Sequence, residues 1–161
     1  MTQPEHSHQQ DSGFALLRVG EMALVVPRDD IRILEMTIDI DCNDPPSRGV
    51  GWIAFGSQRL PVFCPSPALD WMERVADSRP VCAVVAAGPQ VFGLLCSEAG
   101  LIGADEIAFH DMPPAMAAPG SPVLRLAVYQ GAPACVSSAA ALLADIGAAP
   151  ARSTLASEET S

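Results

Sequence analysis

The residues with the widest chemical range in this chain are its five cysteines. They are Cys42, Cys64, Cys82, Cys96 and Cys135, and no two of them have the C-x-x-C spacing of redox and zinc motifs. Four of them lie in apolar runs such as PVCAVVAA and VFGLLCS, where cysteine behaves as a small buried hydrophobe. We therefore expect unreactive thiols. The alternative to unreactive thiols is that the chain is a small thiol- or metal-dependent enzyme on a β-barrel scaffold.

Two short segments carry metal-ligand side chains, and neither of them completes a metal motif. Glu5-His6-Ser7-His8 places two imidazoles near a carboxylate, with no further ligands nearby in a polar stretch. The segment 39–44, DIDCND, begins like an EF-hand loop. That motif requires glycine where Asp44 stands and glutamate where Val50 stands. We predict neither a bound metal nor a cofactor.

Nucleophilic catalysis requires a base held beside serine or cysteine, and His110 is the only histidine beyond the first residues of the chain. Asp111 follows it directly, and adjacent residues on an extended segment point apart, so Asp111 is poorly placed to orient His110. The sequence contains no G-x-S-x-G elbow, and GWIAFG does not match G-x-G-x-x-G. We predict a protein that is not an enzyme and has no catalytic residues.

The charge balance excludes several further functions. Nineteen acidic residues stand against nine basic ones, for a net charge of −10, and every basic residue is an arginine. Without lysine, Schiff-base chemistry and the P-loop motif are excluded, and the scattered arginines argue against nucleic acid as a partner. No apolar run approaches the ~18 residues that predict a membrane span, and residues 1–12 lack the features of a signal peptide. We expect a cytoplasmic protein without direct membrane insertion.

The elements that must position any site are short strands. Four pairs of apolar runs flank turns at Gly20, Gly56, Gly88 and Gly131, which is the pattern of β-hairpins. The segment 28–36 is typical of a helical turn that enters another strand. Two short helices are predicted: one over 68–76 with Ser66 as its N-cap, and one after Ser137-Ser138 that ends at Gly147.

This pattern predicts an all-β fold with two small five-stranded β-barrel lobes and short junction helices. We expect the ordered domain to span residues 13–147. Residues 1–12 and 148–161 are polar and unpatterned, which predicts disordered tails.

Four blocks follow one another along residues 13–147. The first, FALLRVGEMALVVPRDDIRILEM, contains a hairpin, a turn and a strand that ends in Glu35-Met36. The others are GVGWIAFGSQRLPVFCPSPAL, CAVVAAGPQVFGLLCSEAGLIG and VLRLAVYQGAPACVSSAAALL. In this order the blocks resemble the CheW-like adaptor domain of bacterial chemosensory signalling. The resemblance implies a non-catalytic adaptor of a chemotaxis-like or motility pathway that couples a chemoreceptor and a histidine kinase. A regulator of another surface-motility or secretion system is the second possibility among binding modules.

One departure from the family concerns the partner surface. Where the family has Asn-Leu-Arg-Gly at its central turn, this chain has Ile53-Ala54-Phe55-Gly56, and Arg59 is the nearest cation that could substitute. The resemblance places an acidic residue, here Glu35, and the turn arginine near a groove between the lobes. The aromatic and apolar residues around the turn could anchor a partner or fill the core. The residues we predict to bind protein partners are Glu35, Trp52, Phe55, Arg59 and Leu60.

Overall fold

The computed structural model describes residues 13–76, 78–116 and 120–148. The predicted N-terminal tail, with Glu5-His6-Ser7-His8, lies outside these residues. So does the predicted C-terminal tail except Ala148, which is the last residue of a helix. In the described ranges, no helix combines the length and the apolar character that crossing a membrane requires.

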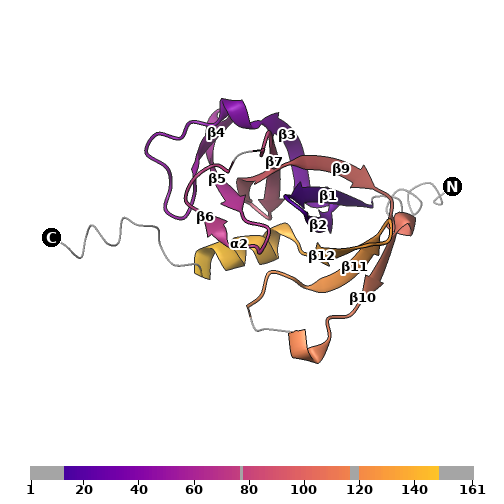
Figure 1. Cartoon of the computed structure of the whole chain (residues 1–161). Helices are drawn as coiled ribbons and strands as arrows, with labels where there is room; N and C mark the ends of the chain where they lie inside the picture. The colour runs from indigo at the N-terminus through magenta and orange to yellow at the C-terminus, as the bar shows by residue number, and fades with distance from the viewer. Residues whose placement is uncertain (1–12, 77, 117–119, 149–161) are drawn as a thin grey trace.

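Four β-hairpins form the framework of the molecule (Figure 1), as the glycine turns predict. Each has a two-residue turn, because Val19 pairs with Met22 and the other three hairpins close in the same way. Gly20, Gly56 and Gly88 have φ between 62° and 64°, a backbone conformation that only glycine adopts at little cost. The hairpins are β1 (Phe14–Val19) with β2 (Met22–Pro27), β4 (Gly51–Phe55) with β5 (Gln58–Pro65), β7 (Val81–Ala87) with β8 (Gln90–Cys96), and β11 (Arg125–Tyr129) with β12 (Ala132–Val136).

Shorter elements join the hairpins. The segment 28–36 forms the predicted helical turn, η1 (Arg28–Asp30), which enters strand β3 (Ile31–Met36). The remaining strands are β6 (Trp71–Met72), β9 (Glu98–Ile102) and β10 (Ile107–His110). The remaining helical segments are η2 (Thr37–Asp39), η3 (Ala104–Glu106), η4 (Pro114–Met116) and α2 (Ala139–Ala148).

The strands form two curled sheets, one for each lobe, which confirms the predicted two-lobed all-β fold (Figure 1). The first sheet has the order β10-β11-β12-β2-β1-β9, and the second has the order β3-β7-β8-β5-β4, with β6 paired to β5. Each sheet therefore has six strands where five were predicted. The additional strands carry little sequence signal, because β6 is only two residues long and β9 follows β8 after Ser97 alone. Asp41 pairs with Trp52 of β4, and this bridge draws the chain after β3 toward the opposite edge of the second sheet.

Three apolar cores hold the molecule together. The first lobe is filled by side chains such as Leu16, Val25 and Ala127, and the second by side chains such as Val62 and Val84. The third and largest core lies between the sheets and includes residues of β1, β2, β7, β8 and α2. Because the shared core is continuous, the two lobes form one structural unit.

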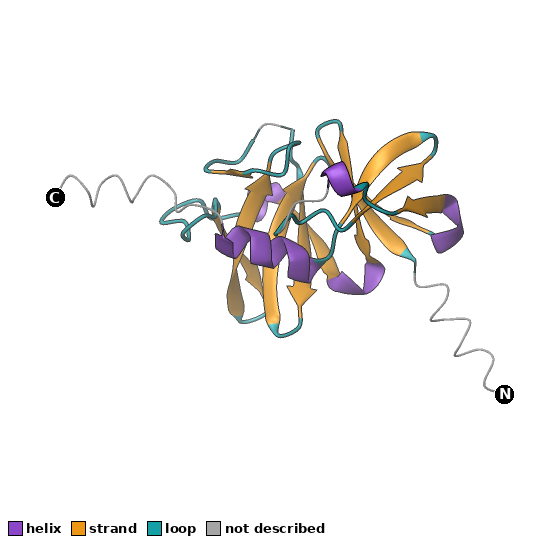
Figure 2. Ribbon diagram, turned by 90° about the horizontal axis from the view of Figure 1, so that it is seen from below, coloured by secondary structure: helices purple, strands orange, loops and turns teal. Residues whose placement is uncertain are grey.

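Helix α2 is the longest helix of the described residues, and it packs against the shared core (Figure 2). Leu142 and Ile146 are buried in the shared core, and the Ser138 side chain accepts a hydrogen bond from the Ala141 N–H, as a predicted N-cap should. The carboxylate of Asp30 in η1 accepts a second hydrogen bond, 2.9 Å, from the Ala139 N–H. The helix continues through Gly147, so Gly147 does not end it.

The helix predicted over 68–76 does not form. The Ser66 side chain accepts hydrogen bonds from the N–H groups of Ala68 and Asp70, and Leu69 has a φ of 64°, so the chain closes a tight turn. β6 follows, and the Trp71 indole N–H donates a 2.9 Å hydrogen bond to Asp145 of α2. A serine that can cap a helix can equally close a turn, and here tertiary contacts of Trp71 favour the turn.

Candidate partner-binding surface

The cysteines are placed as their apolar surroundings predict. Cys64, Cys82 and Cys96 are buried, whereas Cys42, the one outside an apolar run, is exposed. Burial raises the pKa of the Cys82 thiol to about 12, and the nearby Cys96 and Glu35 add to this rise. Burial also raises the pKa of Cys96 to about 12, although the nearby Arg79 opposes the increase. Protonated, buried thiols are poor nucleophiles, which disfavours the thiol-enzyme alternative.

His110 and Asp111 do not form a catalytic pair with a nucleophile in the described ranges. His110 is exposed at the end of β10, and Asp111 is exposed beyond it. Over the same ranges, no three His, Cys, Asp or Glu side chains come together in a way that could hold a metal ion.

Arg59 and Trp52 form a compact cluster with Asp41 on the second lobe. The Arg59 guanidinium lies 4.8 Å from the centre of the Trp52 ring, and its Nη2 lies 4.0 Å from the Asp41 carboxylate. The Trp52 indole N–H donates a 2.9 Å hydrogen bond to the carbonyl oxygen of Asp44. The Arg59 side chain is 61% exposed, so this cluster presents a flat, positively charged group to solvent.

The other three predicted residues lie in different environments. Glu35, in β3, is half-buried opposite Cys82, and no ion pair joins it to Arg59. Phe55 is half-buried and packs against the core of the second lobe, while Ile53 lies fully inside that core. Leu60 is only 4% exposed and fills the same core, so it cannot reach a partner without unfolding and is left out of the surface.

A surface that the residue-by-residue prediction missed lies between the lobes. Strand β3 of the second sheet and strand β9 of the first border an apolar groove of about 40 Å³, lined by residues such as Ile31, Leu34 and Leu101. Leu34 and Leu101 are 47% and 60% exposed, and Met36, two residues beyond Leu34, is 57% exposed. We name Leu34, Met36 and Leu101 the inter-lobe apolar surface. A signal for it was present in IRILEM, whose apolar residues occupy both faces of a strand.

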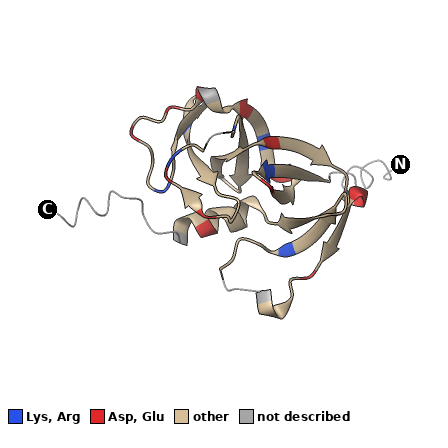
Figure 3. Ribbon diagram, viewed as in Figure 1, with Lys and Arg blue, Asp and Glu red and all other residues tan. Residues whose placement is uncertain are grey.

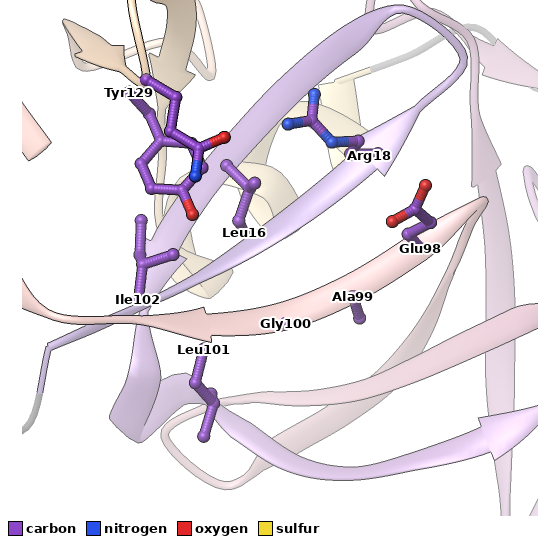
Figure 4. Close-up of a pocket in the computed structure, with 9 residues that line it drawn as sticks. Leu16, Arg18, Glu98, Ala99, Gly100, Leu101, Ile102 and Tyr129 are labelled. Atoms are coloured by element: carbon purple, nitrogen blue, oxygen red, sulfur yellow. The ribbon is translucent and has the colours of Figure 1, made fainter. Parts of the chain in front are cut away.

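The described charged residues are spread along the chain rather than gathered on one face (Figure 3). A second hollow, of about 210 Å³, opens in the first lobe beside β9 (Figure 4). Leu16, Ile102 and Tyr129 line its apolar part, and Arg18 and Glu98 line its polar part. Arg18 and Glu98 are paired across β1 and β9, but no ion pair joins their side chains.

This chain is similar to known proteins in its fold and not in its sequence. No family model matches the sequence, and no curated protein matches it either. Among solved structures, the scaffolding protein TtCheW from Thermoanaerobacter tengcongensis has a similar fold, with a TM-score of 0.62 and 14% sequence identity. The similarity covers 79% of this chain and 88% of the other. The chain therefore has a divergent CheW-like fold.

Proposed function

We propose that this chain is a non-catalytic adaptor of a chemotaxis-like or motility signalling pathway that binds a receptor-like and a histidine-kinase-like protein. The proposal is supported by the CheW-like fold, since the protein with the similar structure is described as a scaffold. The observation that carries it is the inter-lobe apolar surface. Large apolar side chains that are half exposed along a groove are typical of protein-binding sites.

The binding groups lie on two separate surfaces, because β3 and β4 are opposite edges of the second sheet. The inter-lobe apolar surface supplies contact area, and the Arg59–Trp52 cluster supplies charge on the second lobe. Arg59 takes the place of the turn arginine that the resemblance leads one to expect, but it is held by Asp41 and Trp52 rather than by Glu35. Glu35, half-buried opposite Cys82, offers only the exposed part of its side chain to a cation of the partner. Phe55 contributes through its exposed part only.

The test is a titration of the purified chain with the cytoplasmic fragment of a chemoreceptor and, separately, with a histidine kinase from the same genome. The informative variant is Leu34→Ser, and the matched control is Leu124→Ser, a leucine that is 50% exposed in the first lobe, away from the groove. We expect Leu34→Ser to weaken binding of at least one partner by about tenfold or more, and the control to bind like the wild type. Unchanged binding by Leu34→Ser, or no binding of either partner by the wild type, would contradict the proposal.

A further inference from the structure

Strand β9 is an edge strand whose backbone is paired on one side only. It pairs with β1, and no described strand lies along its other side. Gly13 and Arg28 extend the pairing of β1 with β2 by one residue, and the Arg28 N–H donates to the Gly13 carbonyl oxygen. Because the direction of the backbone groups alternates along a strand, the odd-numbered residues of β1 direct theirs toward β2. The even-numbered ones direct theirs toward β9, where the Ser97 N–H donates to the Arg18 carbonyl oxygen.

The register with β9 then identifies the free groups. Leu16 pairs with Gly100 and Phe14 with Ile102, so these β9 residues bond to β1. The alternate residues, Ala99 and Leu101, direct their N–H and C=O groups away from β1. An edge with free donors and acceptors is a template for another strand.

Space for the side chains of such a strand exists on both faces of β9. On one face lies the hollow of about 210 Å³ in the first lobe (Figure 4), and on the other lies the inter-lobe groove of about 40 Å³. Gly100 belongs to the first face, and an added Cβ there would meet no atom within 4 Å. Because alternate residues of a strand point to opposite faces, one added strand would place side chains in both hollows.

The charge at this edge indicates the chemistry of the occupant. Glu98 is exposed, lies at the start of β9 and has no ion-pair partner in the described part of the chain. Arg18, across from it on β1, lies on the side away from the free edge. A basic side chain opposite Glu98 would therefore be favoured, and the net charge of −10 acts in the same direction.

We propose that β9 binds an extended segment of a partner protein as an additional strand of the first sheet. The segment has apolar residues along Gly100 and Leu101 and an arginine or lysine opposite Glu98. Backbone hydrogen bonds to Ala99 and Leu101 supply affinity, and the two hollows and Glu98 supply selectivity. This inference does not depend on the identity of the partners proposed above.

The test uses the full chain and a fluorescein-labelled peptide of alternating threonine and valine with one arginine at its C-terminal end. Two matched controls have the same sequence but carry N-methyl groups on alternate amides, one control for each phase, so that each control is blocked along one of its two edges. We expect fluorescence anisotropy to show binding of the parent peptide, weakened about tenfold or more in at least one N-methylated form. Equal binding of all three peptides, or no binding of the parent, would overturn the proposal.

Two variants of one residue separate backbone pairing from side-chain contact. Leu101→Pro removes the outward N–H while leaving the bonds of its neighbours to β1, and Leu101→Ala keeps the N–H but shortens the side chain. We expect Leu101→Pro to lower peptide affinity about tenfold or more and Leu101→Ala to lower it less. Circular dichroism checks that both variants are folded. One combination of results identifies a second copy of the chain as the occupant. In it the wild type self-associates, Leu101→Pro abolishes the self-association, and the peptide does not bind. The proposal then fails.

Discussion

At the scale of single residues, burial decides what the chemical groups of this chain can do. Cys82 and Cys96 have pKa values of about 12 because they lie inside the apolar cores. Arg79 is also buried, and its guanidinium donates to the Pro65 carbonyl oxygen and to the Cys64 sulfur, which gives it a structural role. By contrast, Arg59 is exposed and held in place by weak contacts, the arrangement that suits a group meant for a partner.

The thiols predict an alkaline loss of stability. The unfolded chain releases the protons of Cys82 and Cys96 near pH 9, whereas the folded chain retains them to about pH 12. The free energy of unfolding should therefore fall as the pH rises from 9 toward 12. Urea denaturation at several pH values measures this fall. The Cys82→Ala and Cys96→Ala double variant should show a shallower fall, and Cys42→Ala the same fall as the wild type. Equal slopes for all three proteins would count against burial as the cause.

The same burial predicts the order in which thiols react. Ellman's reagent at pH 8 should modify Cys42 rapidly and Cys135, which is half-buried with a raised pKa, more slowly. The other three cysteines should react only after denaturation. Rapid modification of Cys64 in the folded chain would show that the second lobe opens readily.

Arg59→Ala should separate binding from stability. An exposed ion pair and an exposed cation–π contact are each worth about 0–1 kcal/mol, so the melting temperature should change little. Binding to the receptor or kinase partner should weaken about tenfold or more if Arg59 anchors it. The matched control is Arg125→Ala, since Arg125 lies 4.6 Å from the Phe109 ring in the first lobe. Equal affinities of the two variants would remove Arg59 from the surface.

At the scale of elements, local chemistry determined most of the structure, and the exceptions have identifiable causes. The four hairpins could be predicted because glycine occupies turn positions with positive φ. The helix over 68–76 could not be excluded, because Ser66 closes a turn with the same side-chain bonds that cap a helix. Contacts of Trp71 decide between the turn and the helix. Its ring packs against Phe63 of β5, and its indole N–H donates to Asp145 of α2, which is distant in sequence. Such contacts are not visible in local patterns.

The same limit applies to the candidate site. Arg59 and Trp52 could be singled out because a cation and an aromatic residue flank one turn. The inter-lobe apolar surface could not, because Leu34 and Leu101 come from different sheets. Leu60 was predicted to lie on the partner surface but is buried, for a related reason. The alternation of side chains along a strand defines two faces, and only the closed lobe shows which face is the interior.

The attachment of α2 to η1 makes a prediction at this scale. Asp30→Ala removes the side-chain acceptor of the Ala139 N–H and should lower stability by about 1 kcal/mol. Asp29→Ala, which removes the adjacent exposed carboxylate, is the control and should be near neutral. Chemical denaturation of both variants measures the difference. If the two cost the same, the cap contributes nothing to stability.

At the scale of the whole molecule, the shared core makes the two lobes one cooperative unit. Leu142 of α2 is fully buried between the sheets. Leu142→Ala should therefore cost about 2–5 kcal/mol and still unfold in a single transition. Tryptophan fluorescence reports on the second lobe and far-ultraviolet circular dichroism on both, so coincident curves would confirm cooperativity. Two separated transitions would show that the lobes are independent.

A two-lobed body with the two proposed binding surfaces would be suited to hold two partners at once. β3 of the inter-lobe apolar surface and β4 of the Arg59–Trp52 cluster are opposite edges of the second sheet, so occupancy of one surface does not by itself exclude occupancy of the other. The proposed function therefore predicts that the chain bridges a receptor-like and a histidine-kinase-like protein.

The most direct measurement of bridging uses a chemoreceptor cytoplasmic fragment coupled to resin and a histidine kinase in solution, with and without the chain. If the chain bridges the two proteins, the resin retains the kinase only when the chain is present, and Leu34→Ser reduces the retained amount while Leu124→Ser does not. Retention of the kinase at the same level without the chain, or no retention with it, would show that the chain does not bridge the two proteins.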